Sequence, residues 1–220
     1  AVQHAVQLPA HDPVLPITAM AAVTENLGFA PTISATYAQP YALARQLSTL
    51  DHLTGGRVAW NVVTSYLESE AVNLGLSGRL PKELRYDRAD EFLDVVYKLW
   101  EHSWEDDAVV YDRDNATFAH PEKVRLINHE GEFFQVPGPH LVEPSPQRTP
   151  VLFQAGASPK GRDFAAKHAE GIFTKNHSLE ATKAYVADIR KRTQEQGRNP
   201  EDVLIFPMVL PSIGSTEEEA

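Results

Sequence analysis

The order of apolar and polar positions along the chain predicts helices and strands that alternate from end to end. Apolar residues at helical spacing predict five helices, over residues 13–26, 39–50, 82–103, 159–169 and 179–196. Short apolar runs rich in β-branched residues predict five strands, over residues 29–37, 57–65, 151–154, 171–174 and 203–210. Because strands alternate with helices, we expect an α/β fold with a parallel sheet.

The number of strands narrows the expected fold. A closed (β/α)8 TIM barrel needs eight strands and about 250 residues, whereas this chain has 220 residues and five predicted strands. We therefore expect one domain over residues 1–220 that is a (β/α)8 barrel lacking its first and last units. The chain begins at Ala1 and stops soon after a strand, so we expect it to be a piece of a longer protein.

Residues 104–150 interrupt the regular order and form a long predicted insertion. Five prolines lie between Pro121 and Pro146, and a hairpin is predicted at residues 129–131. An insertion of this length in a compact fold is usually functional or mobile. Its aromatic side chains either line an apolar lid over a substrate or pack the insertion onto the barrel. Both interpretations stay open for Trp104, Tyr111, Phe118, Phe133 and Phe134.

Composition removes several classes of function. The chain has 20 basic and 30 acidic side chains, a net charge of −10, which disfavours nucleic acid and anionic membranes as partners. The absence of cysteine excludes disulfides, thiol catalysis and thiolate metal sites. Nothing in the sequence resembles a signal peptide or an 18-residue apolar span. We expect a cytoplasmic protein that binds neither nucleic acid nor membrane.

Polar side chains mark the end of the strand predicted over residues 57–65. This strand is almost continuously apolar until Asn61, Thr64 and Ser65. Parallel α/β folds bind their ligands at the carboxyl ends of the strands. The strand therefore predicts a ligand site at its carboxyl end.

A second candidate site follows the strand over residues 151–154. Gly156, Ala157 and Ser158 form a turn of small residues, and Ser158 precedes a proline at a predicted helix start. The first helical turn has unpaired N–H groups that attract anions, and Lys160 and Arg162 add positive charge. An ordinary helix cap is the simpler interpretation, but the position after a barrel strand favours a phosphate site.

The remaining candidates are weaker. The acidic and basic residues around Tyr86 predict a solvated helix face with ion pairs, although Tyr86 itself lies where it could donate to a ligand oxygen. His52 is expected to be a structural hydrogen-bonding residue. The nine histidines have no metal-binding spacing, and neither a nucleophile elbow nor a Walker loop occurs. A redox cofactor, which brings its own reactivity, fits this chain better than side-chain catalysis.

Several runs resemble one subgroup of the bacterial luciferase-like flavin monooxygenases. The resemblance covers nearly the whole chain in the right order, and it is strongest over residues 21–28, 41–45, 49–65, 85–92 and 154–166. The subgroup includes nitrilotriacetate, dibenzothiophene-sulfone and pristinamycin-type monooxygenases. The resemblance implies a (β/α)8 barrel whose long insertion follows the fourth strand.

The resemblance also implies a cofactor and partners. Members of this family bind FMN at the carboxyl ends of the barrel strands and receive it in reduced form from a separate NAD(P)H:flavin reductase. With O₂ they insert one oxygen atom into a small organic substrate. The resemblance further suggests a homo-oligomer, either a dimer or a tetramer.

Roles for individual residues follow from the same resemblance. Thr36, Asn61 and Thr64 are expected to contact the flavin. Tyr86 is expected to reach the ribityl-phosphate region. The phosphate is expected at the turn formed by Gly156, Ala157 and Ser158.

Two departures from the family pattern matter. Relatives commonly have a histidine four residues before the tyrosine, where this chain has Lys82. Lysine preserves a positive charge for phosphate but is a poor proton shuttle at neutral pH. The first strand, first helix and second strand of the family, with an acidic flavin contact, are expected to precede Ala1, and the last barrel units to follow Ala220.

Two other hypotheses stay open on the sequence alone. The same barrel is compatible with a flavin- or deazaflavin-dependent dehydrogenase that transfers no oxygen. A non-catalytic remnant of the barrel that acts as an interaction module is compatible with the missing units and with Lys82.

Overall fold

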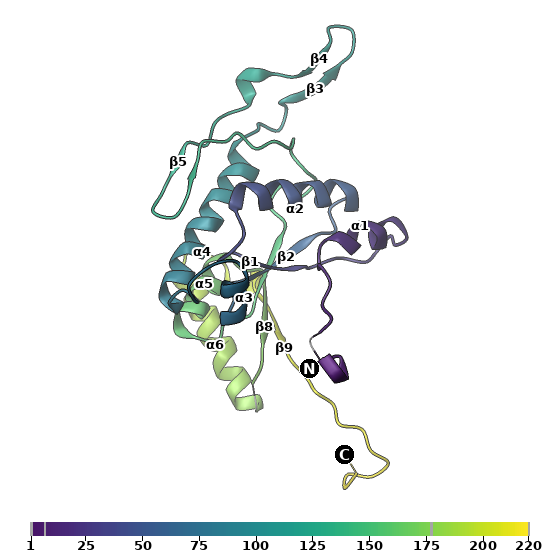
Figure 1. Cartoon of the computed structure of the whole chain (residues 1–220), viewed down its shortest axis with the longest axis vertical. Helices are drawn as coiled ribbons and strands as arrows, with labels where there is room; N and C mark the ends of the chain where they lie inside the picture. The colour runs from purple at the N-terminus through teal and green to yellow at the C-terminus, as the bar shows by residue number, and fades with distance from the viewer. Residues whose placement is uncertain (1, 7, 177, 220) are drawn as a thin grey trace. The chain divides into compact units, whose positions relative to one another are not determined.

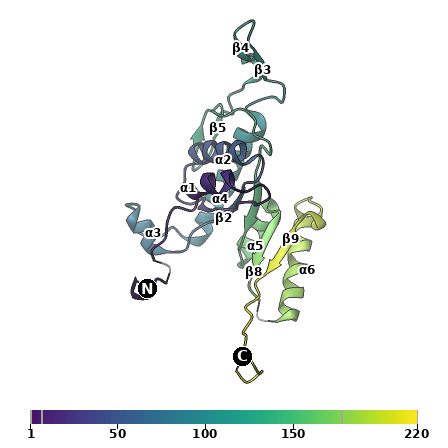
Figure 2. The same cartoon turned by 90° about the vertical axis from the view of Figure 1, so that its right-hand side faces the viewer.

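The computed structural model describes residues 2–6, 8–176 and 178–219. The chain divides into two compact units, Ala1–Leu152 and Phe153–Ala220, and each is described separately. Figures 1 and 2 show helices beside strands in both. Within the described residues, no helix is both long enough and apolar enough to cross a membrane.

The first unit contains a parallel strand pair with helices packed around it. Its elements before the insertion are η1 (Val2–His4), α1 (Leu15–Ala22), β1 (Thr32–Ser34), α2 (Pro40–Thr54), β2 (Ala59–Val63), α3 (Glu68–Asn73), α4 (Lys82–Tyr97) and the π-helical turn η2 (Lys98–His102). Strands β1 and β2 pair in parallel, with Thr32 opposite Asn61 and Ser34 opposite Val63. The Trp60 ring of β2 packs 5.7 Å from the Phe92 ring of α4, which joins the strands to the helices.

The boundaries of α1 and α2 differ from the sequence prediction for identifiable reasons. Helix α1 ends at Ala22 because Thr24 donates to the Met20 carbonyl and Arg57 donates to the carbonyls of Ala21 and Leu27. Helix α2 continues to Thr54, four residues past the prediction. Gly55 then adopts a φ of +61°, a left-handed conformation that suits glycine and ends the helix.

The insertion consists of two short hairpins joined by irregular chain. Its elements are β3 (Val109–Asp112), β4 (Thr117–Ala119), η3 (Pro121–Lys123), β5 (His129–Glu130) and β6 (Gln135–Val136). The pairs β3–β4 and β5–β6 are antiparallel, so the hairpin predicted at residues 129–131 is confirmed. The β3–β4 hairpin projects beyond α2 (Figure 1).

The aromatic side chains of the insertion differ in how much they are buried. Phe134 is buried and its ring meets that of Phe92 edge-on, with centroids 5.6 Å apart, so it packs the insertion onto α4. The indole N–H of Trp104 donates to the His140 carbonyl within the insertion. Tyr111 and Phe118 pair with each other at 5.1 Å and stay exposed on the β3–β4 hairpin.

The second unit is a βαβαβ arrangement. Its elements are β7 (Val151–Gln154), whose first two residues belong to the first unit, α5 (Pro159–His168), β8 (Gly171–Thr174), α6 (Leu179–Glu195), η4 (Pro200–Asp202) and β9 (Leu204–Pro207). The strands are parallel in the order β7–β8–β9. Its core consists of Ala165, Ala169, Ile172, Tyr185, Ile189 and Val203. All five predicted strands and their parallel direction are therefore confirmed.

Candidate functional site

The carboxyl ends of β1 and β2 are joined by side-chain hydrogen bonds. The Thr36 hydroxyl donates to the Thr64 carbonyl at 2.8 Å, and the Ser65 hydroxyl donates to the Ser34 hydroxyl at 2.8 Å. Thr36 is buried, and Ser65 has a φ of +50°, which is uncommon for a residue other than glycine. The structure thus brings Thr36 and Thr64, two of the residues expected to contact the flavin, next to each other.

Asn61 lies on β2 with one half of its amide unsatisfied. Its Nδ2 donates to the Thr32 hydroxyl at 2.9 Å, while its Oδ1 is buried and has no hydrogen-bond partner. A buried carbonyl oxygen without a donor is costly, so it marks a place where a ligand N–H is favourable. This orphaned oxygen is the observation in the first unit that most directly indicates a polar ligand.

Two arginines of α4 point at the same strand ends, and the sequence interpretation missed both. Arg85 Nη1 donates to the Thr64 carbonyl at 3.0 Å, and Arg88 Nε donates to the Thr36 carbonyl at 3.1 Å. Arg88 also lies over the Phe134 ring, 4.3 Å from its centroid. Burial lowers the pKa of Arg88, and the negative charge of Glu91 opposes that shift. The available signal was the spacing of Arg85, Arg88 and Phe92 on one helix face.

The other predicted residues of α4 lie at its start. Tyr86 is buried in the first turns of the helix, whereas Lys82, the first residue of α4, is exposed. Tyr86 therefore lies next in sequence to the arginine that contacts Thr64.

Glu91 corrects the expectation that the charges of α4 form only a solvated face. Its carboxylate accepts hydrogen bonds from the backbone N–H of Phe133 and Phe134, at 3.0 Å and 2.8 Å, and contacts His129 Nε2 at 3.2 Å. Burial alone would raise the pKa of Glu91, but these hydrogen bonds together hold it below its usual value. Glu91 is thus a partly buried carboxylate that attaches the β5–β6 hairpin to α4.

In the second unit, the turn before α5 has the predicted cap. Ser158 Oγ accepts from the backbone N–H of Gly161 at 3.1 Å, which leaves its hydroxyl hydrogen available to a ligand oxygen. The Gly156 N–H donates to the Gln154 side chain, so it is held within the protein. A Cβ at Gly156 would lie 2.8 Å from both the Cα and the carbonyl oxygen of Gly161. The turn therefore requires a small residue at this position.

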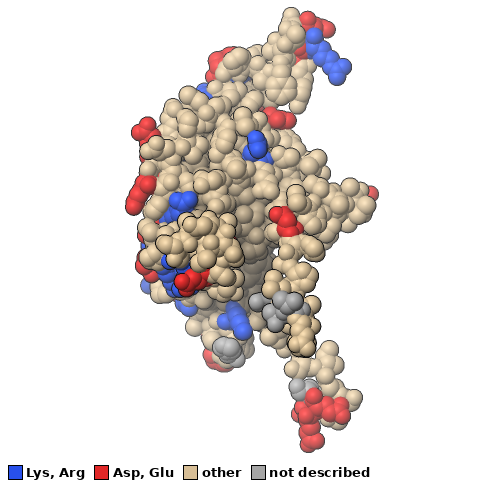
Figure 3. Space-filling view, in the orientation of Figure 1, with Lys and Arg blue, Asp and Glu red and all other residues tan. Residues whose placement is uncertain are grey.

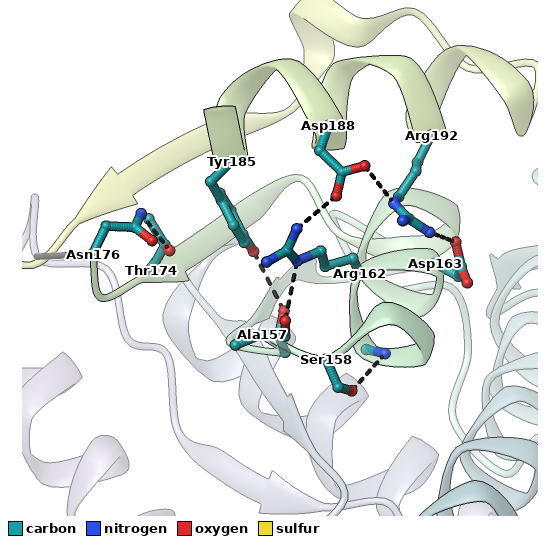
Figure 4. A network of polar contacts seen from close by, with 11 residues as sticks. Ala157, Ser158, Arg162, Asp163, Thr174, Asn176, Tyr185, Asp188 and Arg192 are labelled. Atoms are coloured by element: carbon teal, nitrogen blue, oxygen red, sulfur yellow. Dashed lines mark hydrogen bonds and ion pairs between the residues drawn. The ribbon is translucent and has the colours of Figure 1, made fainter. Parts of the chain in front are cut away.

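Arg162 contributes less free charge to this turn than the sequence predicts. Its guanidinium donates to the Ala157 carbonyl at 3.0 Å and to Asp188 at 2.8 Å, and Asp188 also accepts from Arg192 at 3.0 Å (Figure 4). Burial would raise the pKa of Asp188, but the two arginines hold it below its usual value. Arg162 therefore shapes the turn, while its charge is balanced by Asp188.

Histidines and surface charges add little to the site. No group of three or more histidine and acidic side chains with metal-binding geometry occurs among the residues that the structure describes. His52 contacts the Glu143 carbonyl at 3.3 Å, which confirms its role as a structural hydrogen-bonding residue. Acidic and basic side chains are scattered over the face drawn in Figure 3.

Comparison with known proteins shows to which protein family the chain belongs. The family model described as "Luciferase-like monooxygenase" matches residues 1–220. The chain belongs to this family. The resemblance seen in the sequence is therefore confirmed.

Individual luciferase-like monooxygenases are similar over the whole chain or nearly all of it. The long-chain alkane monooxygenase of Geobacillus thermodenitrificans is 55% identical over 100% of this chain and 50% of its own length. The dimethyl-sulfide monooxygenase of Hyphomicrobium sulfonivorans is 51% identical over 100% of this chain and 46% of its own length. Nitrilotriacetate monooxygenase component A of Aminobacter aminovorans is 42% identical over 95% of this chain and 46% of its own length. The chain thus spans about half the length of these curated relatives.

Solved structures of the family confirm the fold class. The crystal structure of long-chain alkane monooxygenase matches with a TM-score of 0.94 at 55% identity, covering 100% of this chain and 50% of that chain. The crystal structure of DmoA from Hyphomicrobium sulfonivorans matches with a TM-score of 0.90 at 53% identity, covering 94% of this chain and 45% of that chain. The chain is therefore part of a (β/α)8 barrel of the luciferase-like type.

Proposed function

We propose that this chain is part of a two-component, FMN-dependent monooxygenase that uses reduced flavin and O₂ to oxygenate a small organic substrate. The reduced flavin comes from a separate NAD(P)H:flavin reductase. Several relatives support this proposal by name, including an FMNH₂-dependent dimethylsulfone monooxygenase that is 31% identical over 96% of this chain. When bound, the reduced flavin supplies the electrons that activate O₂.

The single structural observation that carries the proposal is the unpaired Oδ1 of Asn61. The flavin ring presents N–H and C=O groups on one edge, and a buried acceptor beside strand-end hydroxyls suits such an edge. We assign Thr36, Asn61 and Thr64 to the flavin ring.

The remaining roles complete the proposal. We assign Tyr86 to the ribityl-phosphate region. The phosphate is assigned to Gly156, Ala157 and Ser158, because the Ser158 hydroxyl hydrogen is available at the start of a ten-residue helix. We further propose that residues 1–220 belong to one barrel domain, with 104–150 as its insertion, and that the protein is a cytoplasmic dimer or tetramer.

Flavin binding tests the proposal directly. Titration of the full-length protein with reduced FMN under argon is expected to give micromolar or tighter binding, because the site is assigned to the reduced cofactor. Oxidised FMN is expected to bind more weakly. Absence of binding by both forms would end the proposal. Incorporation of label from ¹⁸O₂ into product distinguishes an oxygenase from a dehydrogenase on the same barrel.

Replacement of Ser158 tests the phosphate assignment. Ser158→Ala is expected to weaken FMN by about 10-fold, in line with about 1.5 kcal/mol for a hydrogen bond to a charged group, while riboflavin, which lacks the phosphate, binds unchanged. Ser178→Ala is a matched control, because Ser178 caps α6 through an identical 3.1 Å bond to the Ala181 N–H. Equal losses for FMN and riboflavin would remove the phosphate role.

A further inference from the structure

Arg85 is a buried cation at the strand-end site. It lies in the first turns of α4, only 6% of its surface is exposed, and its Nη1 donates to the Thr64 carbonyl. Its Nε is buried and has no hydrogen-bond partner. The side chain is thus directed at the residues assigned to the flavin ring and retains an unused donor there.

The charge of Arg85 has no counterpart among the described residues. Within that part of the chain, Arg85 forms no ion pair, whereas Arg148 pairs with Asp106 and Arg162 pairs with Asp188. Arg88, one turn further along α4, is close enough to Glu91 for that carboxylate to affect its pKa. A buried guanidinium without an anion is costly, so the site is suited to a ligand that brings a negative charge.

We propose that Arg85 binds the negative charge of the reduced flavin ring and thereby makes the site prefer reduced over oxidised flavin. This inference rests on the proposed FMN-dependent function. The oxidised ring is neutral, whereas the reduced ring is an anion at neutral pH, with its charge shared between N1 and the adjacent carbonyl oxygen. Two adjacent acceptors match the planar fork of an arginine side chain.

A simpler role for Arg85 makes a different prediction. An arginine that only caps the Thr64 carbonyl would use Nη1 alone and would be indifferent to the redox state of the ligand. An arginine that binds the phosphate would affect both redox states equally, because both carry the same phosphate. The ratio of the two affinities therefore separates these roles.

The test compares reduced and oxidised FMN on four forms of the full-length protein. These are the wild type, Arg85→Gln, Arg85→Lys and the control Arg45→Gln, which removes an exposed arginine of α2. Arg85→Gln is expected to weaken reduced FMN by about 10- to 100-fold, the range for losing a charged hydrogen bond, and to leave oxidised FMN nearly unchanged. Arg85→Lys is expected to keep part of the preference, since it keeps the charge without the fork. Arg45→Gln is expected to change neither affinity.

The outcomes that overturn the inference are distinct from failure of the proposed function. Equal losses for both redox states, or no loss for either, would overturn it while FMN binding by the wild type stands. No FMN binding by the wild type would instead remove the proposed function. If circular dichroism shows that Arg85→Gln does not fold, the absorption spectrum of reduced FMN bound to the wild type tests the inference instead. Just below the pKa of free reduced FMN, an anionic spectrum supports the role of Arg85 and a neutral spectrum overturns it.

Discussion

Gly156 shows how a single residue can be fixed by its neighbours rather than by its own conformation. A methyl group at this position would meet backbone atoms of Gly161 at 2.8 Å and the Gln154 side-chain nitrogen at 2.9 Å. Backbone atoms cannot move aside as a flexible side chain can. The close approach of residues 156 and 161 therefore sets the shape of the turn that we assign to phosphate.

Gly156→Ala is expected to destabilise the protein by about 1–3 kcal/mol, the usual cost of overpacking, and to weaken FMN. Urea denaturation measures the first effect and flavin titration the second. Gly78→Ala is the control, because its nearest contact would be an ordinary 3.8 Å from the Glu68 side chain. A Gly156→Ala protein as stable as Gly78→Ala would contradict the packing described above.

Single residues also differ in how far sequence predicts them. The Ser158 cap and the glycine at position 55 were predictable because their partners lie within a few positions along the chain. Arg85 and Asn61 were less predictable, since the partner of one is Thr64 and that of the other is Thr32, 21 and 29 positions away. The sequence thus located Asn61 but could not show that its Oδ1 lacks a partner.

At the scale of elements, His140 ties the insertion to α2. Its Nε2 lies 2.9 Å from the Ser48 hydroxyl, its N–H donates to Ser103, and its carbonyl accepts from Trp104. The Nδ1 atom is buried without a partner. Burial lowers the pKa of His140 to about 4, although the charge of Glu143 opposes the shift.

His140 is therefore expected to make the protein less stable as the pH falls. The unfolded chain takes up a proton near pH 6.5 and the folded one only near about 4, so stability is lost as the pH falls from the first value toward the second. The full loss in the free energy of unfolding is about 3 kcal/mol, because each unit of pKa difference between the folded and unfolded states contributes about 1.4 kcal/mol. Urea denaturation at several pH values from about 7.5 to about 5.5 gives the free energy of unfolding as a function of pH. The slope of that free energy against pH should be smaller for His140→Gln than for the wild type. His102→Gln, at an exposed histidine, should keep the wild-type slope; equal slopes in all three proteins would refute this account.

Elements with strong periodicity were predicted well, and so was the hairpin at residues 129–131, but the contacts that hold the insertion in place were not. The apolar face of α4 fixes that helix because Phe92, Val95 and Val96 are all fully buried. The insertion is held by Glu91, by His140 and by Asp51, which accepts two hydrogen bonds from Gln147. Such contacts between distant polar residues leave no periodic signal in the sequence.

At the scale of the whole molecule, the alternation of strands and helices was enough to predict a parallel α/β fold. The barrel class followed from that alternation together with the resemblance to a family. The charge balance around Arg162 was not predictable, because it depends on Asp188 in another helix. A basic residue in a sequence shows that a charge exists but not whether a carboxylate neutralises it.

The pairing of Arg162 with Asp188 has a consequence for dissolved salt. Sites that bind phosphate through unpaired arginines lose affinity steeply as the salt concentration rises. Here the guanidinium is already neutralised, and the chain as a whole carries a charge of −10 that repels an anion. Shortening the Debye length from about 14 Å to about 7 Å with sodium chloride should therefore leave the affinity for oxidised FMN unchanged or slightly tighter. Fluorescence titration across that range of ionic strength measures it, and a steep fall would mean that a free cation binds the phosphate after all.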